Sequence, residues 1–183
     1  MIIDMVIIML YIVDNGKGAK DISIHLRMKH EIVSPKKIKP NGSAYILTDG
    51  DIKNKADNVK FIKSAKIPVL GIGAGAAFIA ASFDAPVKEG KCEKSKIVKV
   101  NKSCPLLLDF KKVFKAEDSC NVIIEDLPEN IYPVASSQHY EFEIIQDMQN
   151  PFFGVHFNPT TPETFNILRN FEKFLGVWER FHK

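Results

Sequence analysis

The chain has 183 residues, of which 45% are hydrophobic and 26% are charged, and it carries a formal net charge of +3. These values are typical of a globular protein, and we expect one domain over residues 1–183. The lysines are spread along the chain without a basic block, so we expect no nucleic-acid partner. Three cysteines, Cys92, Cys104 and Cys120, are too few and too scattered for a disulfide framework or a zinc site. An odd number of thiols fits a reducing cytoplasm, and we expect neither a metal nor another cofactor.

The first residues, MIIDMVII, are apolar but lack the features of a targeting segment. Asp4 interrupts them, no basic residue precedes them, and no small-residue cleavage site follows. The run is also shorter than the about 20 apolar residues that cross a bilayer. We therefore expect a buried first strand over residues 6–13 and no membrane association, with either Met1 or Met9 as the natural start.

Apolar runs alternate with amphipathic stretches in the first half of the chain. The turn signal Asp14-Asn15-Gly16 ends the first strand, and a helix is predicted over residues 20–29. The other predicted elements of this half are strands at 30–35, 43–48 and 67–72 and helices at 56–65 and 75–83. Such alternation predicts a parallel sheet with helices on both faces.

After residue 86 the pattern changes to short strands joined by turns. We predict strands at 94–100, 110–114, 121–126, 132–136, 141–146 and 152–157, and a closing helix over 162–175. The predicted fold class is α/β with three layers: a mostly parallel, twisted, flavodoxin-like central sheet between helices, extended by a small antiparallel β-meander.

The stretch PVLGIGAGAA, residues 68–77, predicts a strand, a tight turn and a helix. This shape suits a nucleophile elbow, or a dinucleotide site in which glycines let the backbone approach a pyrophosphate. The match to G-x-G-x-x-A is weak, because that fingerprint belongs on a first strand and needs an acidic residue about 20 residues later. Glu89 and Glu93 lie near that distance only within a lysine-rich loop. A third reading is that the small residues simply allow the helix to pack closely on the sheet.

The segment IPVLGIGAGAAFIAASF resembles the elbow of class I, or triad, glutamine amidotransferases, with the pattern P-[IV]-L-G-[IV]-C-x-G-[HM]-Q and an apolar helix. The likeness extends over most of the chain, and within the family it is greatest to the glutaminase subunits of archaeal-type GMP synthases. The other segments that carry it are YIVDNGKGAKDISIHLR, YILTDGDI, LPENIYPVAS and PFFGVHFNPTTPETFNILRNF. The resemblance implies the amidotransferase fold.

The resemblance also implies where a catalytic triad would lie. Family glutaminases use a cysteine nucleophile on the elbow, a histidine that moves protons, and a glutamate that orients the histidine. The equivalent positions here are Gly73, Asn158 and Thr160. Glycine has no side chain and asparagine has no group that titrates near neutral pH, so we expect no intact catalytic residue.

The departure extends to the rest of the family's site. The oxyanion-loop equivalents are Asp49, Gly50 and Ala74, and a carboxylate there would repel a developing oxyanion, which needs hydrogen-bond donors. The equivalents of the family's other pocket residues are Ala76, Ala77, Ser95, Ser119 and Cys120.

A rebuilt site would have to use other side chains. Cys92, Cys120 and His156 are the candidates, and a Cys92–His156 dyad requires the two groups to meet within hydrogen-bond reach. The simpler interpretation makes Cys92 an exposed loop thiol, Cys104 and Cys120 small buried hydrophobes, and His156 a strand histidine with its hydrogen bonds satisfied.

These observations favour a non-catalytic amidotransferase-like protein that acts as a partner-binding or regulatory subunit. The partner implied by the resemblance is a synthetase subunit of the ATP-pyrophosphatase type, or a genuine glutaminase that is a paralogue. Two alternatives stay open: an amide hydrolase or glutamine amidotransferase with a rebuilt site, and a sensor that binds a nucleotide or an amino acid in the vacated pocket.

Overall fold

The computed structural model describes residues 9–91, 94–118 and 120–182, and the statements below concern these residues. The helices are α1 (Ala19–His25), α2 (Lys55–Ser64), α3 (Ala74–Ala81) and α4 (Asn166–Phe181), with short 3-10 helices η1 (Pro35–Lys37), η2 (Ile52–Asn54) and η3 (Pro105–Leu107). The strands are β1 (Leu10–Val13), β2 (Gly16–Lys17), β3 (His30–Val33), β4 (Ala44–Leu47), β5 (Asp49–Gly50), β6 (Val69–Ile72), β7 (Val87–Glu89), β8 (Ser95–Val100), β9 (Val113–Glu117), β10 (Val122–Ile124), β11 (Ile131–Ser136), β12 (Ile144–Asp147) and β13 (Phe152–Val155).

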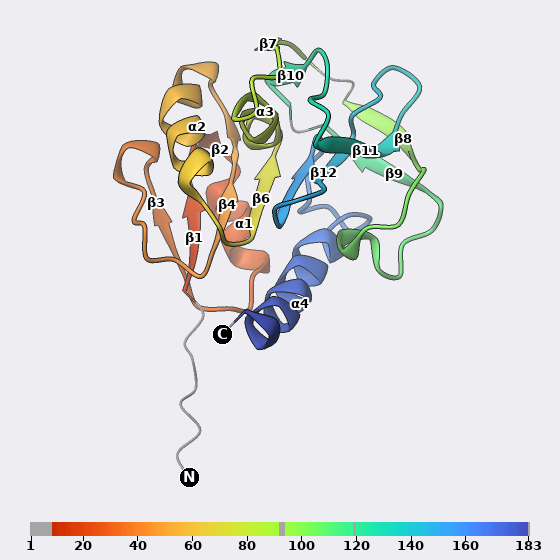
Figure 1. Cartoon of the computed structure of the whole chain (residues 1–183). Coiled ribbons are helices and arrows are strands. Elements are labelled where there is room, and N and C mark those ends of the chain that lie inside the picture. Colours follow the sequence, from red (N-terminus) through yellow and green to blue (C-terminus); the bar gives the residue numbers. More distant parts are fainter. Residues whose placement is uncertain (1–8, 92–93, 119, 183) are drawn as a thin grey trace.

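The core of the molecule is a nine-stranded sheet in the order β3-β1-β4-β6-β13-β12-β11-β8-β9. The first five strands in this order are parallel, and the last four continue the sheet as an antiparallel meander. The five parallel strands have the flavodoxin-like order. The chain places β3 on one side of β1 and then adds β4, β6 and β13 in turn on the other side. The predicted α/β fold with an appended meander is therefore confirmed (Figure 1).

Helices cover both faces of the sheet, and the alternation of side chains along β1 shows why. Leu10 and Ile12 pack on one face with α1 and α4, whereas Tyr11 and Val13 pack on the other face with α2 and α3. Successive side chains of a strand point to opposite faces, so an apolar run without polar interruptions has to be buried on both. Figure 1 shows α4 lying across one face and α2 and α3 on the opposite side.

Two small ribbons lie outside the main sheet, β2 with β5 and β7 with β10. The first ribbon brings the loop after β1 against the loop after β4. A Cβ atom on Gly50 would lie 1.8 Å from the carbonyl oxygen of Asn15, so only glycine permits this approach. These two loops form one side of the site described below.

Three predicted elements differ from the structure. The helix predicted over residues 20–29 ends at His25, because Leu26 is already extended. The strand predicted over 110–114 lies later, at β9, since Asp109 adopts a left-handed conformation with φ of 65° and turns the chain before it. The closing helix starts at Asn166 rather than 162 and continues to Phe181, because the segment before it is a turn.

No helix in the described part of the chain combines the length and apolar character needed to span a bilayer. Residues 6–8 of the predicted first strand lie outside the described residues.

Candidate active site

The elbow predicted from the sequence is present between β6 and α3. Gly73 has φ 56° and ψ −115°, a conformation that side-chain-bearing residues rarely adopt, and α3 begins at the next residue. The Gly73 N–H donates to the carbonyl oxygen of Val155 at 2.8 Å, which ties the elbow to the end of β13. The strand, tight turn and helix predicted from the sequence are therefore in place, with a glycine at the turn.

Small residues around the elbow allow α3 to lie directly on the sheet. A Cβ atom on Gly75 would come within 2.1 Å of the carbonyl oxygen of Leu47, and one on Gly71 within 2.5 Å of the amide nitrogen of Ala76. Contacts this short are not made by real Cβ atoms, so glycine is required at both positions. Close packing of helix on sheet thus accounts for these glycines without a bound phosphate.

The N-terminus of α3 already holds an anion, which the chain supplies itself. The Asp49 side chain is 1% exposed, and its Oδ1 accepts the N–H of Ala74 at 2.9 Å. Its Oδ2 lies 3.0 Å from the ammonium of Lys17 and 3.4 Å from the side-chain amide of Asn121. A negative charge is favoured at the start of a helix, and here it also joins three loops of the site.

This arrangement bears on acyl-transfer chemistry. A backbone N–H after the elbow residue is the kind of donor that stabilises the oxyanion of a tetrahedral intermediate. In this structure the Ala74 N–H, the first after the elbow residue, is engaged by the Asp49 carboxylate. The sequence indicated a repulsive carboxylate in this loop, but the hydrogen bond that places it at α3 is visible only in the structure.

Asn158 and Thr160 follow β13 and contact each other. The side-chain oxygen of Asn158 accepts hydrogen bonds from the N–H of Thr160 at 3.0 Å and from its hydroxyl at 2.7 Å. The Asn158 N–H donates to the carbonyl oxygen of Glu117 at 2.7 Å. Gly73, which bonds to the last residue of β13, belongs to the same edge of the sheet. Neither Asn158 nor Thr160 offers a group that exchanges a proton near neutral pH.

His156 is fully buried beside a buried ion pair. Its Nδ1 donates to the carbonyl oxygen of Phe142 at 2.9 Å, whereas its Nε2 has no hydrogen-bond partner among the described residues. Burial, together with the ammonium of Lys96, lowers the pKa of His156 to about 3. The ring is therefore neutral at physiological pH and closed to solvent. The expectation that all its hydrogen bonds are satisfied is wrong for Nε2.

The ion pair joins Lys96 on β8 to Glu143, with 2.7 Å between Nζ and Oε2 and side-chain exposures of 3% and 0%. Lys96 also donates to the carbonyl oxygen of His156 at 2.8 Å, and the hydroxyl of Ser137 donates to Glu143 Oε1 at 2.7 Å. Burial raises the pKa of Glu143, against the opposing effect of Lys96. Sequence analysis missed this pair, because the two residues are far apart in the chain.

Two of the three cysteines lie in the described part of the chain. Cys104 and Cys120 are both buried, as predicted, and burial raises the pKa of the Cys104 thiol to about 12. The thiol of Cys120 donates to the carbonyl oxygen of Val122 at 3.5 Å. Cys92 and Ser119 lie outside the described residues. No cluster of His, Cys, Asp and Glu in the described ranges is arranged to hold a metal ion.

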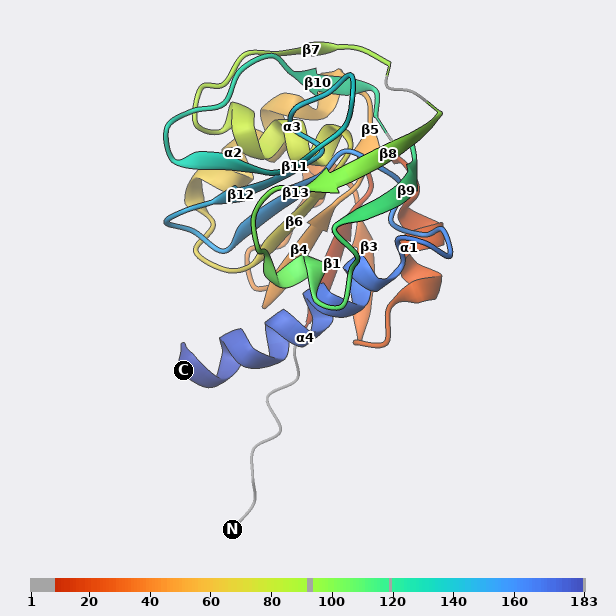
Figure 2. The same ribbon diagram turned by 90° about the vertical axis from the view of Figure 1, so that its right-hand side faces the viewer.

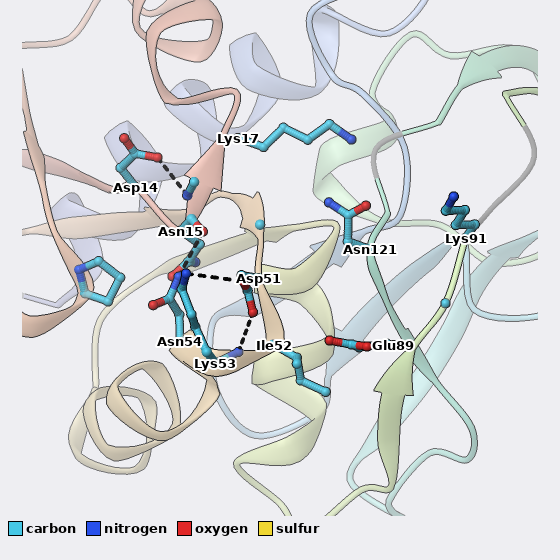
Figure 3. A pocket seen from close by; sticks show the side chains of 14 residues that line it. Asp14, Asn15, Lys17, Asp51, Ile52, Lys53, Asn54, Glu89, Lys91 and Asn121 are labelled. Carbon is cyan, nitrogen blue, oxygen red and sulfur yellow. Dashed lines mark hydrogen bonds and ion pairs between the residues drawn. The ribbon is translucent and has the colours of Figure 1, made fainter.

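A polar pocket of about 920 Å³ opens beside Asp49, beyond the carboxyl ends of β1 and β4. Figure 3 shows Lys17 and Asn121 pointing toward one another across it. Its lining comprises Asp14, Asn15, Gly16, Lys17, Pro35, Gly50, Asp51, Ile52, Lys53, Asn54, Glu89, Gly90, Lys91 and Asn121. Small molecules bind open α/β sheets outside the carboxyl ends of the strands. They bind at the point where the connections that leave two neighbouring strands run to opposite faces of the sheet. The turn Asp14-Asn15-Gly16 was predicted only as the end of the first strand, and the pocket that it lines was not predicted from the sequence.

Comparison with known sequences identifies the group of proteins that this chain is similar to. The pattern of the family "Glutamine amidotransferase class-I" matches residues 20–174. One subunit of the glutamine-hydrolyzing GMP synthase of Methanocaldococcus jannaschii is 30% identical over 186 residues, covering 92% of this chain and 98% of the relative. The corresponding subunit of Methanococcus aeolicus is 29% identical over 188 residues, covering 92% and 98%.

Solved structures show the same fold. A GMP synthase subunit from Thermoplasma acidophilum superposes with a TM-score of 0.86 at 23% identity, over 96% of this chain and 97% of that one. A glutamine amidotransferase from Thermotoga maritima superposes with a TM-score of 0.69 at 16% identity, over 95% and 83%.

Proposed function

Because this chain belongs to the class-I glutamine amidotransferase family, we propose that it is a member that has lost glutamine hydrolysis and acts as a partner-binding or regulatory subunit. One observation carries the proposal: the Asp49 carboxylate occupies the N-terminus of α3 and takes the Ala74 N–H. A site that stabilises an oxyanion needs donors at that point, not a second negative charge.

The residues at the family's triad positions support the same proposal. Forming a thioester requires a thiol on the elbow, and residue 73 is a glycine. Proton transfer to the leaving ammonia requires a base and acid beside it, and Asn158 with Thr160 offers only an amide bonded to a hydroxyl. The proposal therefore rests on three positions and on Asp49, which all lie at the same edge of the sheet.

The partner we propose is a synthetase subunit of the ATP-pyrophosphatase type, or a catalytically intact glutaminase of the same family. The similar proteins from Methanocaldococcus jannaschii and Methanococcus aeolicus are each named as one subunit of GMP synthase, and a subunit is one component of an assembly. This chain keeps the fold of such a component over 96% of its length, which supports a role in the same kind of assembly.

The test combines activity and binding. We expect the purified chain to release no ammonia from glutamine, alone or with the synthetase subunit from the same organism, while an intact glutaminase of the family assayed in parallel does. We expect the chain and the synthetase subunit, or the chain and the intact glutaminase, to co-elute in size-exclusion chromatography. Ammonia release by the chain alone, or failure to co-elute with either protein, would contradict the proposal.

The pocket supports a second function, that of a small-molecule sensor. Its volume of about 920 Å³ is that of a typical ligand site, and it lies where α/β sheets bind ligands. A ligand that binds only the folded chain raises its melting temperature by mass action. A thermal-shift screen with nucleotides and amino acids tests this function, and an unchanged melting temperature at millimolar concentrations of each would exclude those ligands.

A further inference from the structure

Strand β9 is the outer edge of the nine-stranded sheet (Figure 2). It pairs with β8 on its inner side, where the Val100 N–H donates to the carbonyl oxygen of Lys112 at 2.8 Å. In an antiparallel pair every second residue turns its backbone groups toward the partner strand. Since Lys112 faces β8, the N–H and C=O groups of Val113 and Lys115 point away from the sheet, and no hydrogen bond satisfies them within the described part of the chain.

One end of this edge is already paired by the chain itself. Asp118 and Phe157 form an antiparallel bridge, and the Asn158 N–H donates to the carbonyl oxygen of Glu117 at 2.7 Å. Beyond this contact, a groove of about 410 Å³ continues along β9, with Glu163 and Asn166 on its other side. The open part of the edge therefore has both unpaired backbone groups and the space for an extended segment.

The two faces of β9 differ in chemistry. The outer face carries Lys115, which lies beside Ile97 of β8, and Val113, which lies beside Lys99. The exposed fraction is 51% for Val113 and 58% for Ile97. On the inner face Phe114 contacts Phe110, with 5.0 Å between the ring centroids, and both line the same groove as Glu163. A segment added to this edge would alternate between a residue beside Lys115 and a residue against Phe114.

The positive charge of this region favours the binding of an acidic segment. Residues 94–118 contain seven lysines and three acidic residues, a net charge of +4, whereas the whole chain has +3. The region around this edge is therefore locally basic. Lys96 is buried in its ion pair; the other six are exposed and have no ion pair among the described residues, namely Lys94, Lys99, Lys102, Lys111, Lys112 and Lys115.

We infer that β9 and its groove bind an extended segment of a partner protein, with acidic and apolar residues in alternation, by strand addition. This deepens the proposed function, because it names the surface and the chemistry of the partner. Lysines on an edge strand prevent pairing with a second copy, since Lys115 would lie close to its own equivalent, but they favour an acidic strand. Exposed Ile97 and Val113, rather than exposed aromatic rings, favour a protein over single-stranded RNA.

The test uses the full chain and a synthetic probe, so it does not depend on the synthetase subunit. The probe is a fluorescein-labelled peptide of eight residues that alternates glutamate and valine, followed by fluorescence anisotropy at low salt. Three further probes separate the contributions: the same peptide with lysine for glutamate, the same peptide N-methylated throughout, and an RNA of eight uridines. We expect saturable binding of the first peptide and at least about tenfold weaker binding of the other three.

Four variants locate the site. Lys115→Glu reverses one charge at the edge, and Lys60→Glu makes the same change on the exposed surface of α2. Val113→Pro removes an outward N–H without breaking a bond to β8, whereas Val113→Ala shortens the side chain and keeps that N–H. We expect Lys115→Glu and Val113→Pro to weaken binding at least about fivefold, Lys60→Glu to change it less than about twofold, and Val113→Ala to weaken it clearly less than Val113→Pro does, with circular dichroism verifying the fold.

Several results would overturn the inference. They are no saturable binding of the acidic peptide, equal weakening by Lys115→Glu and Lys60→Glu, equal binding of the N-methylated peptide, or tighter binding of the RNA. The last would assign the surface to a nucleic acid. This experiment contains no synthetase subunit. Failure of the peptide to bind would therefore not count against the proposed partner, and failure to co-elute with that partner would not count against binding at β9.

Discussion

Replacing Lys96 by methionine tests the buried ion pair that joins β8 to Glu143, on the segment between β11 and β12. The side chain is 3% exposed, and its ammonium bonds to Glu143 and to the carbonyl oxygen of His156. Methionine keeps most of the volume and removes the charge. The Glu143 carboxylate, 0% exposed, then stays buried with only the hydroxyl of Ser137 as a hydrogen-bond donor among the contacts described.

The expected loss is about 3 to 5 kcal/mol of unfolding free energy, which is typical when one partner of a buried ion pair is removed. For a chain of this length each kcal/mol lowers the melting temperature by about 2 to 4 °C, so we expect a decrease of about 6 to 20 °C. The double variant Lys96→Met/Glu143→Leu should recover most of this loss, because it also removes the uncompensated charge.

The loss should depend on pH. Burial raises the pKa of Glu143, and removing Lys96 takes away an interaction that lowers it. A carboxyl whose pKa is higher in the folded state than in the unfolded one costs stability as pH rises from about 4.3 through the folded value. Lys96 also lowers the pKa of His156, so its removal reduces the cost of protonating that ring at low pH. The effect on Glu143 makes the penalty of Lys96→Met larger at pH 8 than at pH 5, whereas the effect on His156, whose pKa is about 3, acts at more acidic pH.

The assay is urea unfolding followed by circular dichroism at both pH values. The matched control is Lys99→Met, on the same strand but exposed and without an ion pair in the described structure, which should change the unfolding free energy by less than about 0.5 kcal/mol. A loss below about 1 kcal/mol for Lys96→Met, or one that is equal at pH 5 and pH 8, would refute the reasoning.

Three further substitutions test the elbow by the same unfolding measurement. Gly75→Ala should lower the unfolding free energy by at least about 2 kcal/mol, because its Cβ has to push α3 away from β4. The control is Gly176→Ala in α4, where a Cβ meets nothing within 4 Å, and it should raise the unfolding free energy by about 0.5 to 1 kcal/mol. Equal effects of the two substitutions would contradict the packing argument. Gly73→Ala should cost about 1 to 3 kcal/mol through backbone strain, and no cost would mean that the elbow relaxes. Asp49→Asn keeps an acceptor for Ala74 but loses the charge, so we expect a loss of about 1 to 2 kcal/mol that shrinks at high salt; a loss independent of salt would contradict the electrostatic account.

The parallel half of the sheet could be predicted because its physical signal is local. Runs such as residues 44–47 and 69–72 are apolar throughout, as strands buried on both faces must be, and amphipathic helices separate them. The prediction over residues 20–29 was wrong at its end, since apolar residues two apart in that stretch do not define a helical face. Ribbons of two or three residues, such as β2 with β5, are too short to leave any periodicity.

The site was predictable only where one segment carries it. The elbow could be located because strand, turn and helix are contiguous, but the environment of Asp49 is built by Lys17, Ala74 and Asn121 from three separate loops. The same holds for Lys96 and Glu143. They meet because β8, which carries Lys96, pairs with β11, and the segment that follows β11 carries Glu143. Long-range pairing of this kind follows from the topology and leaves no mark on the local pattern.

The central claim is that this amidotransferase-like chain forms no covalent intermediate with glutamine. It is tested most directly by intact-mass spectrometry after incubation with an electrophilic glutamine analogue, such as a diazo ketone, beside an intact glutaminase as the positive control. The account predicts an unchanged mass for this chain under conditions that label the control completely. A stoichiometric adduct on Cys92 or Cys120, prevented by an excess of glutamine, would contradict it and establish a rebuilt catalytic site.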